Sequence, residues 1–279
     1  MHLLHTSDWH LGQDFHGFSR EYEHQTFLTW LEDQLEELGV DALVVSGDIF
    51  DNQNPPIAAQ RMLFEFIGRA VRRVPQLDIV LIGGNHDSAG RLEAPSPLLD
   101  AFGVRVVGSL PRDAEGGIDP DRLLLPLTDR HGERAALCAA VPFLRPPDLP
   151  PLNDEAEEPA LIRGVREIYR QVLDLCADRL GRNEALVVTG HCYMTGSEIS
   201  ELSERRILGG NQHALPHDLI PETVSYGALG HLHKPQRVGG RETLRYSGSP
   251  LPLSVTERHY RHQVALVDLK GAAAHVQAL

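Results

Sequence analysis

Five short, mainly apolar runs recur along the chain, and each is interpreted as a buried strand. They cover residues 3–4, 42–45, 79–82, 185–188 and 224–229. Runs that stay apolar without alternating with polar residues are typical of strands covered on both faces, as in parallel sheets. The hydrophobic pattern therefore predicts a sheet buried between helices.

Helical spacing fills most of the intervals between these runs. Residues 19–38, 57–74 and 160–180 each place apolar side chains three or four positions apart, and Gly39 and Pro75 follow the first two segments directly. Gly and Pro mark helix ends, so the three segments are predicted to be helices. Alternation of strand and helix predicts an α/β fold with a largely parallel sheet.

The remaining segments have weaker patterns. Residues 104–141 contain short β-like runs, and residues 145–159 are rich in proline and acidic residues, which predicts an exposed loop inserted in the domain. After residue 244 short strands are expected, including residues 246–250 and 262–269. We predict a single domain without internal repeats.

Each apolar run ends in residues that can bind metal ions. The five endings are Asp8-Trp9-His10, Gly47-Asp48, Gly84-Asn85-His86-Asp87, Gly190-His191 and Gly230-His231-Leu232-His233. Functional side chains of open α/β sheets collect beyond the carboxyl ends of the strands. We therefore expect these residues to meet at one edge of one sheet.

The types of these residues restrict the metal. Carboxylate, amide and imidazole groups are present and no cysteine occupies a ligand-like position, which favours Mn²⁺, Mg²⁺, Fe²⁺ or Zn²⁺ over a thiolate-bound structural zinc. Asp8 and His10 are two residues apart, so on a strand both would face the same ion; His231 and His233 repeat this spacing, with Leu232 turned inward. Any one motif alone could be a turn, a helix cap or surface histidines. Five in succession favour a dinuclear site.

Asn85, His86 and Asp87 divide into different roles. Asn85 offers a neutral oxygen ligand, and the adjacent His86 cannot easily point at the same ion. His86 is therefore predicted to face the substrate as a general acid or a stabiliser of the transition state. Asp87 is predicted to hydrogen-bond His86, fixing its tautomer and raising its pKa.

Composition limits the class of protein. The 279 residues carry a formal charge of −13, which counts against tight binding of nucleic acid by this chain alone, because such affinity comes mainly from Lys and Arg. No apolar stretch approaches 18 residues and no signal-peptide pattern begins the chain. The three cysteines are far apart in the sequence, which fits a reducing compartment. We expect a cytoplasmic protein.

The order of the five endings resembles that of the calcineurin-like metallophosphoesterase superfamily. Three longer segments, residues 5–12, 47–51 and 246–254, resemble the SbcD-like nucleases, which are related to the Mre-type double-strand-break repair nucleases. The resemblance extends over essentially the whole chain. It implies a four-layer α/β/β/α metallophosphoesterase sandwich and two Mn²⁺ ions, with Mg²⁺ or other divalent ions as alternatives.

The resemblance also assigns roles to individual residues. It implies that Asp8, His10 and His233 hold one ion, that Asn85, His191 and His231 hold the other, and that Asp48 bridges them. His86 falls at the position of the family's catalytic histidine.

The implied activity is that of a DNA exonuclease and endonuclease that processes ends and hairpins in repair and recombination. Implied partners are DNA, an SbcC-type coiled-coil ATPase and a second copy of the chain, with the helix at residues 57–74 as a candidate dimer surface. Residues 1–279 are expected to form the nuclease domain, with the DNA-binding cap and the ATPase-docking segment absent or truncated.

Two other functions remain open. The first is a dinuclear-metal phosphoesterase acting on small phosphate esters or cyclic nucleotides. The stretch around Asp51 lacks the Asp-Arg-Gly of the protein-phosphatase branch, which counts against that branch. The second is a non-catalytic docking scaffold, although scaffolds typically lose ligands that this chain retains.

Overall fold

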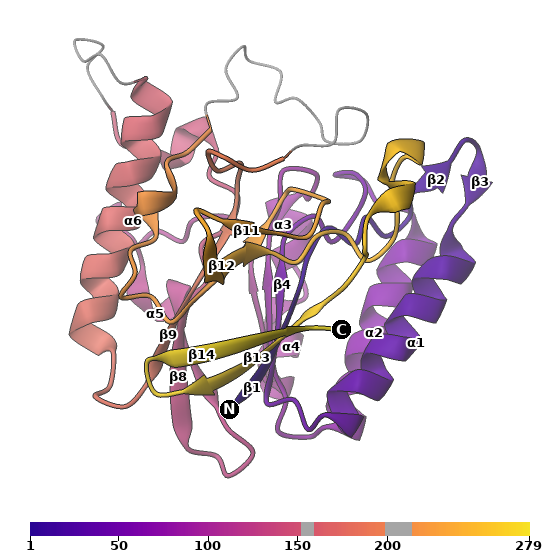
Figure 1. The fold of residues 1–279 in the computed structure, drawn as a ribbon, viewed down its shortest axis with the longest axis horizontal. Helices are drawn as coiled ribbons and strands as arrows, with labels where there is room; N and C mark the ends of the chain where they lie inside the picture. Colours follow the sequence, from indigo (N-terminus) through magenta and orange to yellow (C-terminus); the bar gives the residue numbers. More distant parts are fainter. Residues whose placement is uncertain (152–158, 199–213) are drawn as a thin grey trace.

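The computed structural model describes residues 1–151, 159–198 and 214–279, and within these ranges it contains two six-stranded sheets flanked by helices (Figure 1). The strands are β1 His2–Thr6, β2 Asp14–Phe15, β3 Phe18–Ser19, β4 Ala42–Ser46, β5 Asp78–Ile82, β6 Val104–Val107, β7 Leu124–Thr128, β8 Arg134–Ala139, β9 Ala185–His191, β10 Tyr226–Gly230, β11 Gln236–Val238, β12 Arg241–Tyr246, β13 Ala265–Lys270 and β14 Ala273–Ala278. The α-helices are α1 Glu21–Glu37, α2 Ile57–Arg73, α3 Ala89–Glu93, α4 Ser96–Leu99, α5 Pro120–Leu123 and α6 Ala160–Arg179.

The ligand-bearing strands belong to two sheets. The first has the order β14-β13-β1-β4-β5-β6, and the second has the order β11-β12-β10-β9-β8-β7. β1, β4, β5 and β6 run parallel to one another, as do β8, β9, β10 and β12. Antiparallel pairs are formed by β13 with β1 and β14, by β11 with β12 and by β7 with β8. The prediction of one sheet is therefore wrong, because β1, β4 and β5 pair separately from β9 and β10.

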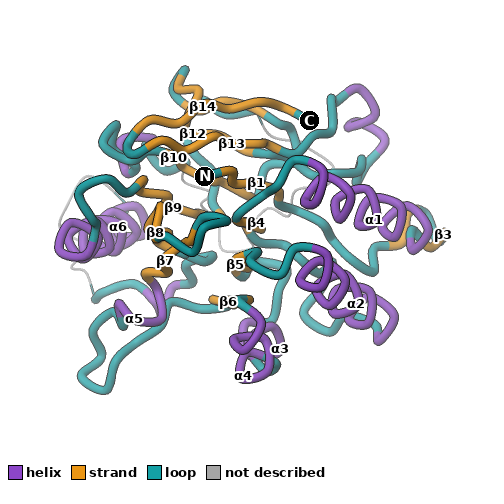
Figure 2. The backbone as a smooth tube through the Cα atoms, turned by 90° about the horizontal axis from the view of Figure 1, so that it is seen from below, coloured by secondary structure: helices purple, strands orange, loops and turns teal. Residues whose placement is uncertain are grey.

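Side chains of the first sheet pack on both of its faces. Along β4, Ala42 and Val44 belong to the core between the sheets, and Leu43 and Val45 belong to the core beneath α1 and α2. Burial on both faces explains why this strand is an unbroken apolar run in the sequence. The helix α6 covers the second sheet, so the layers run helix, sheet, sheet, helix (Figure 2). This is the expected four-layer α/β/β/α sandwich.

The main helices agree with the sequence pattern within one or two residues at each end. Helix α1 ends just before Gly39, which has a φ of 57°, a backbone conformation that suits glycine. Residues 246–250, in contrast, were predicted to form a strand and do so only at Tyr246. Gly248 has a φ of 78° and turns the chain against residue 233, so the segment leaves the sheet. Among the described residues, no helix is both long and apolar enough to cross a membrane.

Candidate dinuclear metal centre

The carboxyl ends of strands in both sheets, and the loops that follow them, carry the predicted ligands; His191 is the last residue of β9. A hydrogen bond of 3.0 Å from Ser46 Oγ to the carbonyl oxygen of Ala228 joins β4 to β10 at this end. The carboxyl ends of the two sheets thus lie together, which explains why residues from separate sheets converge. The predicted ligands do lie at the carboxyl ends of strands, but these strands belong to two sheets and not to one.

Backbone strain is concentrated in these loops. Five non-glycine residues of the described chain have positive φ, and four of them are predicted ligands: Asp8 at 55°, His10 at 48°, Asp48 at 49° and His231 at 98°. Such conformations are unfavourable for residues with a Cβ and persist where surrounding structure holds them, commonly at functional sites. Asp8 and His10 are therefore not on an extended strand, so their convergence comes from a turned backbone rather than from the predicted strand period of two.

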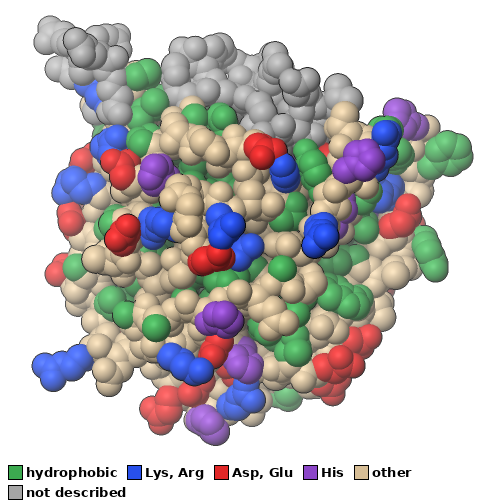
Figure 3. Space-filling view, in the orientation of Figure 1, with side chains coloured by type: hydrophobic (Ala, Val, Ile, Leu, Met, Phe, Trp, Pro, Cys, Tyr) green, Lys and Arg blue, Asp and Glu red, His purple; other side chains and the backbone are tan. Residues whose placement is uncertain are grey.

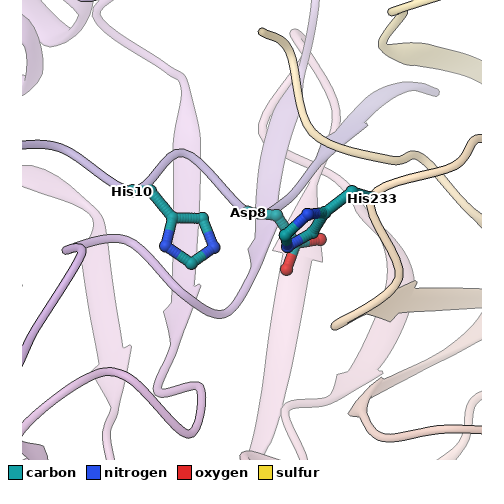
Figure 4. Close-up of side chains that lie close together, drawn as sticks. All are labelled: Asp8, His10 and His233. Atoms are coloured by element: carbon teal, nitrogen blue, oxygen red, sulfur yellow. The ribbon is translucent and has the colours of Figure 1, made fainter. Parts of the chain in front are cut away.

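Asp8, His10 and His233 form the first group of potential ligands. One potential metal-ligand atom from each residue lies within 4.8 Å of the other two, and all three residues are buried (Figure 4). The carboxylate of Asp8 is fixed by hydrogen bonds from Ser7 Oγ at 2.6 Å and from the backbone N–H of His231 at 3.0 Å. The Asp8 carboxylate is therefore held in place before any ion is present.

Asp48, His191 and His231 form the second group by the same 4.8 Å criterion. The Oδ1 atom of Asn85 lies 2.9 Å from His191 Nε2 and 3.0 Å from His231 Nδ1, which adds the predicted amide oxygen to this group. The Nδ1–H of His191 donates to the carbonyl oxygen of Ser46 at 2.9 Å, so its Nε2 faces the site.

Asp48, a member of the second group, also lies close to the first. Its Oδ2 atom is 3.3 Å from His191 Nε2 on one side and 3.7 Å from His10 Nε2 on the other. The backbone N–H of His86 donates to its Oδ1 at 2.8 Å. This central position suits a carboxylate that is shared by two cations.

A divalent ion fits the first group on its own geometry. His10 Nε2 is buried and, among the described residues, has no hydrogen-bond partner. A buried polar atom without a partner costs free energy, and an imidazole lone pair is a good ligand for divalent transition metals. The oxygen and nitrogen ligand atoms around it favour the same divalent ions as the residue types in the sequence, namely Mn²⁺, Mg²⁺, Fe²⁺ or Zn²⁺.

Mutual electrostatics set the protonation of the second group. Burial raises the pKa of Asp48, but His191 and His10 outweigh it and hold that pKa well below its usual range. Burial lowers the pKa of His191, and the carboxylate of Asp48 outweighs it to give a pKa of about 9. Burial, and then repulsion from His191, lower the pKa of His231 to about 3. In the metal-free chain Asp48 and His191 are thus an ion pair, and cation binding would displace the proton on His191.

His86 lies beside the first group but is held differently. Its Nδ1 is 2.7 Å from the carbonyl oxygen of Asp51, and its ring meets that of His10 edge-on at 4.7 Å between centroids. A potential metal-ligand atom of His86 also lies within 4.8 Å of such atoms of His10 and Asp48. Proximity alone therefore permits His86 either as a ligand or as an acid facing the substrate.

The predicted pairing of Asp87 with His86 is wrong. The carboxylate of Asp87 accepts hydrogen bonds from the backbone N–H groups of Ile49, Phe50 and Gly84 at 2.9–3.1 Å. Burial, and then the nearby Asp48, raise its pKa to about 6. Asp87 thus joins the loop after β4 to the loop after β5, and Asp51 supplies the partner of His86 through its main chain.

Two further residues at the site were not expected from the sequence. Arg145, predicted to begin an exposed loop, is half-buried, and its Nη2 donates to the carbonyl oxygens of Gly84 and Asp87 at 3.2 and 3.1 Å. Glu257 is fully buried beside His233. Neither residue lies in a periodic pattern or next to a ligand in the sequence, so only the folded chain brings them to the site.

Comparison with known proteins agrees with this geometry. The sequence model of the calcineurin-like phosphoesterase family matches residues 1–235. The chain is 46% identical over 278 residues to SbcD of the nuclease SbcCD from Rhodobacter capsulatus, and 37% identical over 276 residues to the protein of that name from Escherichia coli. These alignments cover 98% and 97% of the chain. The chain spans about two thirds of the length of these relatives, 68% and 66% respectively.

The Bacillus subtilis protein of the same name is 33% identical over 97% of the chain and 66% of its own length. A solved dimetal phosphatase from Danio rerio has 12% identity and a TM-score of 0.46 over 99% of this chain and 98% of its own, too weak a likeness to add to the assignment. The chain belongs to the calcineurin-like phosphoesterase family and, within it, to the group of SbcD proteins. It is therefore a metal-dependent phosphoesterase that uses divalent ions.

Close packing at Gly84 provides a test of how rigid the site must be. A Cβ added to this residue would collide with Oδ1 and the backbone nitrogen of Asp48. Gly84→Ala should therefore displace Asp48, and a displacement of about 1 Å can cost roughly 100-fold in rate. The measurement is hydrolysis of an aryl phosphodiester together with calorimetric titration of Mn²⁺.

Gly90→Ala is the matched control, because nothing lies within 4 Å of the added Cβ and alanine favours helix α3. Its rate and Mn²⁺ affinity should equal those of the unaltered chain. Equal rates in the two variants would contradict the claim that the position of Asp48 is tightly constrained.

Proposed function

We propose that this chain is the catalytic domain of a Mn²⁺-dependent DNA nuclease that acts as the SbcD component of an SbcCD-type complex. The observation that carries the proposal is the central carboxylate of Asp48 between two buried groups of ligands. Relatives at up to 46% identity are named as a subunit of the nuclease SbcCD, which supports DNA as the proposed substrate. The reaction is hydrolysis of a phosphodiester bond, and no covalent intermediate with the enzyme is required.

We assign one ion to Asp8, His10 and His233 and the other to Asn85, His191 and His231, with Asp48 shared between them. Bound cations would supply Lewis-acid stabilisation of the charge that develops on the phosphate. The nitrogen and oxygen donors suit Mn²⁺, and the same donors accept Mg²⁺ or Fe²⁺.

The hydrogen bond at Nδ1 fixes the orientation of His86. The carbonyl oxygen of Asp51 can only accept, so Nδ1 carries a proton and the ring is fixed in one orientation. In the imidazolium form His86 carries a second proton at Nε2, which we propose is transferred to the leaving 3′ oxygen. His86 thus acts as a general acid and not as a ligand in this proposal.

The charge of the chain indicates how DNA would be held. A net charge of −13 opposes binding to a phosphate backbone, and the face seen in Figure 3 shows Lys and Arg scattered among Asp and Glu. We therefore propose that an SbcC-type ATPase partner supplies much of the basic surface. Residues 1–279 are proposed as one nuclease domain, since β13 and β14, beyond the family match, complete the first sheet.

Dimerisation and location are also proposed. Helix α2 exposes Ile57 and Phe64, which supports its outer face as a surface for a second copy of the chain. The described residues contain three free cysteines, which fits a reducing cytoplasm.

A comparison of substrates tests the proposed function. With Mn²⁺, the chain should cleave single-stranded and hairpin DNA in preference to an aryl phosphate monoester or a cyclic nucleotide. Preference for the small substrates would identify a different phosphoesterase. Turnover of neither, by a chain that carries two ions and with an SbcC-type partner added, would indicate a docking scaffold.

A further inference from the structure

The chain after β12 returns to the metal centre. The backbone N–H of Ser249 donates to the carbonyl oxygen of His233 at 3.1 Å. Further along, Arg20 Nη1 donates to the carbonyl oxygen of Pro252 at 2.6 Å, and Gln13 Nε2 donates to that of Leu253 at 3.3 Å. Residues 247–259, which we call the return segment, are thus fixed both to the loop of His233 and to the chain that follows His10.

Glu257, in a short 3-10 helix of the return segment, has no exposed surface. Its Oε1 lies 2.9 Å from His233 Nδ1, and its Oε2 accepts a hydrogen bond from the backbone N–H of Leu253 at 2.7 Å. A buried carboxylate is costly unless it is paired and hydrogen-bonded. The return segment therefore folds so that both oxygens of this carboxylate have partners.

The contact with Glu257 determines which nitrogen of His233 can bind a metal. Imidazole nitrogen is more basic than a carboxylate oxygen, so the shared proton resides on Nδ1. Nε2 is then left with a lone pair to offer to the group formed with Asp8 and His10, beside which the ring lies (Figure 4). A carboxylate partner also makes the imidazole a stronger donor.

The two groups of ligands differ in this respect. His191, in the second group, has a neutral carbonyl oxygen of Ser46 at its Nδ1, whereas His233, in the first group, has the carboxylate of Glu257. A change at Glu257 should therefore affect the Asp8, His10 and His233 group and leave the other group unaltered. Glu257 lies beyond residues 1–235, which match the family.

We propose that Glu257 is a positioning residue that holds His233 in the Nδ1–H tautomer and raises the metal affinity of the Asp8, His10 and His233 group. The proposal rests on the proposed two-ion function. It makes the return segment, and not only the loops at the strand ends, part of the metal centre.

Two readouts on Glu257→Gln test it. Calorimetric titration of the metal-free chain with Mn²⁺ should show two sites, of which one is weakened about 10–100-fold and the other is unchanged. Ring ¹⁵N chemical shifts of His233 in the metal-free chain should show protonation at Nδ1 in the wild type and a mixture of tautomers in the variant. Glu242→Gln is the matched control, since Glu242 is exposed on β12, and it should change neither readout.

Protonation of His233 at Nε2 in the wild type, or unaltered affinity of both sites in Glu257→Gln, would overturn the proposal. Equal weakening of both sites would also overturn it, because that result indicates a general structural role. If the unaltered chain bound fewer than two ions while the tautomers behaved as expected, the two-ion function would be wrong and the positioning of His233 by Glu257 would stand. Glu257→Asp, which keeps the carboxylate, should retain more affinity than Glu257→Gln.

Discussion

Asp48→Asn should abolish the joint binding of two ions. It should also reduce phosphodiester cleavage by more than roughly 10–100-fold, the usual effect of removing a residue that only hydrogen-bonds to a metal ligand. The carboxylate of Asp48 lies 3.3 Å from His191 Nε2 in one group and 3.7 Å from His10 Nε2 in the other. Asparagine has the same shape and can still accept the hydrogen bond from the His86 N–H, so the fold should persist. The measurements are Mn²⁺ titration and DNA cleavage on the same preparation.

Asp268→Asn serves as the control for this substitution, because Asp268 pairs with Lys270 on the outer part of the first sheet. It should retain both ions and full activity. Two ions bound to Asp48→Asn with unaltered affinity would contradict the bridging role. The thermal unfolding temperatures of both variants should be measured without metal. An unchanged temperature for Asp48→Asn would show that the variant has lost a metal ligand and not its fold.

His86→Ala should lower the rate of DNA cleavage by about 10²–10⁴-fold while both ions remain bound. The reason is that His86, held at Nδ1 by the carbonyl oxygen of Asp51, is proposed to supply a proton and not a metal ligand. The measurement is single-turnover cleavage with excess Mn²⁺, accompanied by the metal content of each protein. His275→Ala, on the outer strand β14, is the control and should behave as wild type.

Metal content distinguishes the two roles that proximity allows for His86. Loss of one ion together with activity would assign His86 to the ligands, alongside His10 and Asp48. Full activity with both ions present would remove it from the mechanism.

Local sequence pattern was sufficient to predict most of the elements. Strands buried on both faces, such as β4, leave continuous apolar runs, and amphipathic helices such as α2 and α6 leave regular spacing. The predicted ligands were also brought together, because the carboxyl ends of parallel strands are where loops converge.

Features that depend on distant parts of the chain were not predictable in this way. Whether β1 and β9 share a sheet is decided by strand pairing across long sequence separations, not by their composition. Asp87 was paired with the wrong residue because its position next to His86 in the sequence does not reveal that its carboxylate folds back onto the N–H groups of Ile49 and Phe50. Glu257 is 24 residues from His233, and nothing in its local sequence marks it as buried.

Anomalous X-ray scattering from a crystal of the chain soaked in Mn²⁺ would test the two-ion site most directly. We expect two peaks per chain, one beside Asp8, His10 and His233 and one beside Asn85, His191 and His231, with Asp48 in contact with both. A single peak, or an ion held by His86 in place of His233, would contradict it.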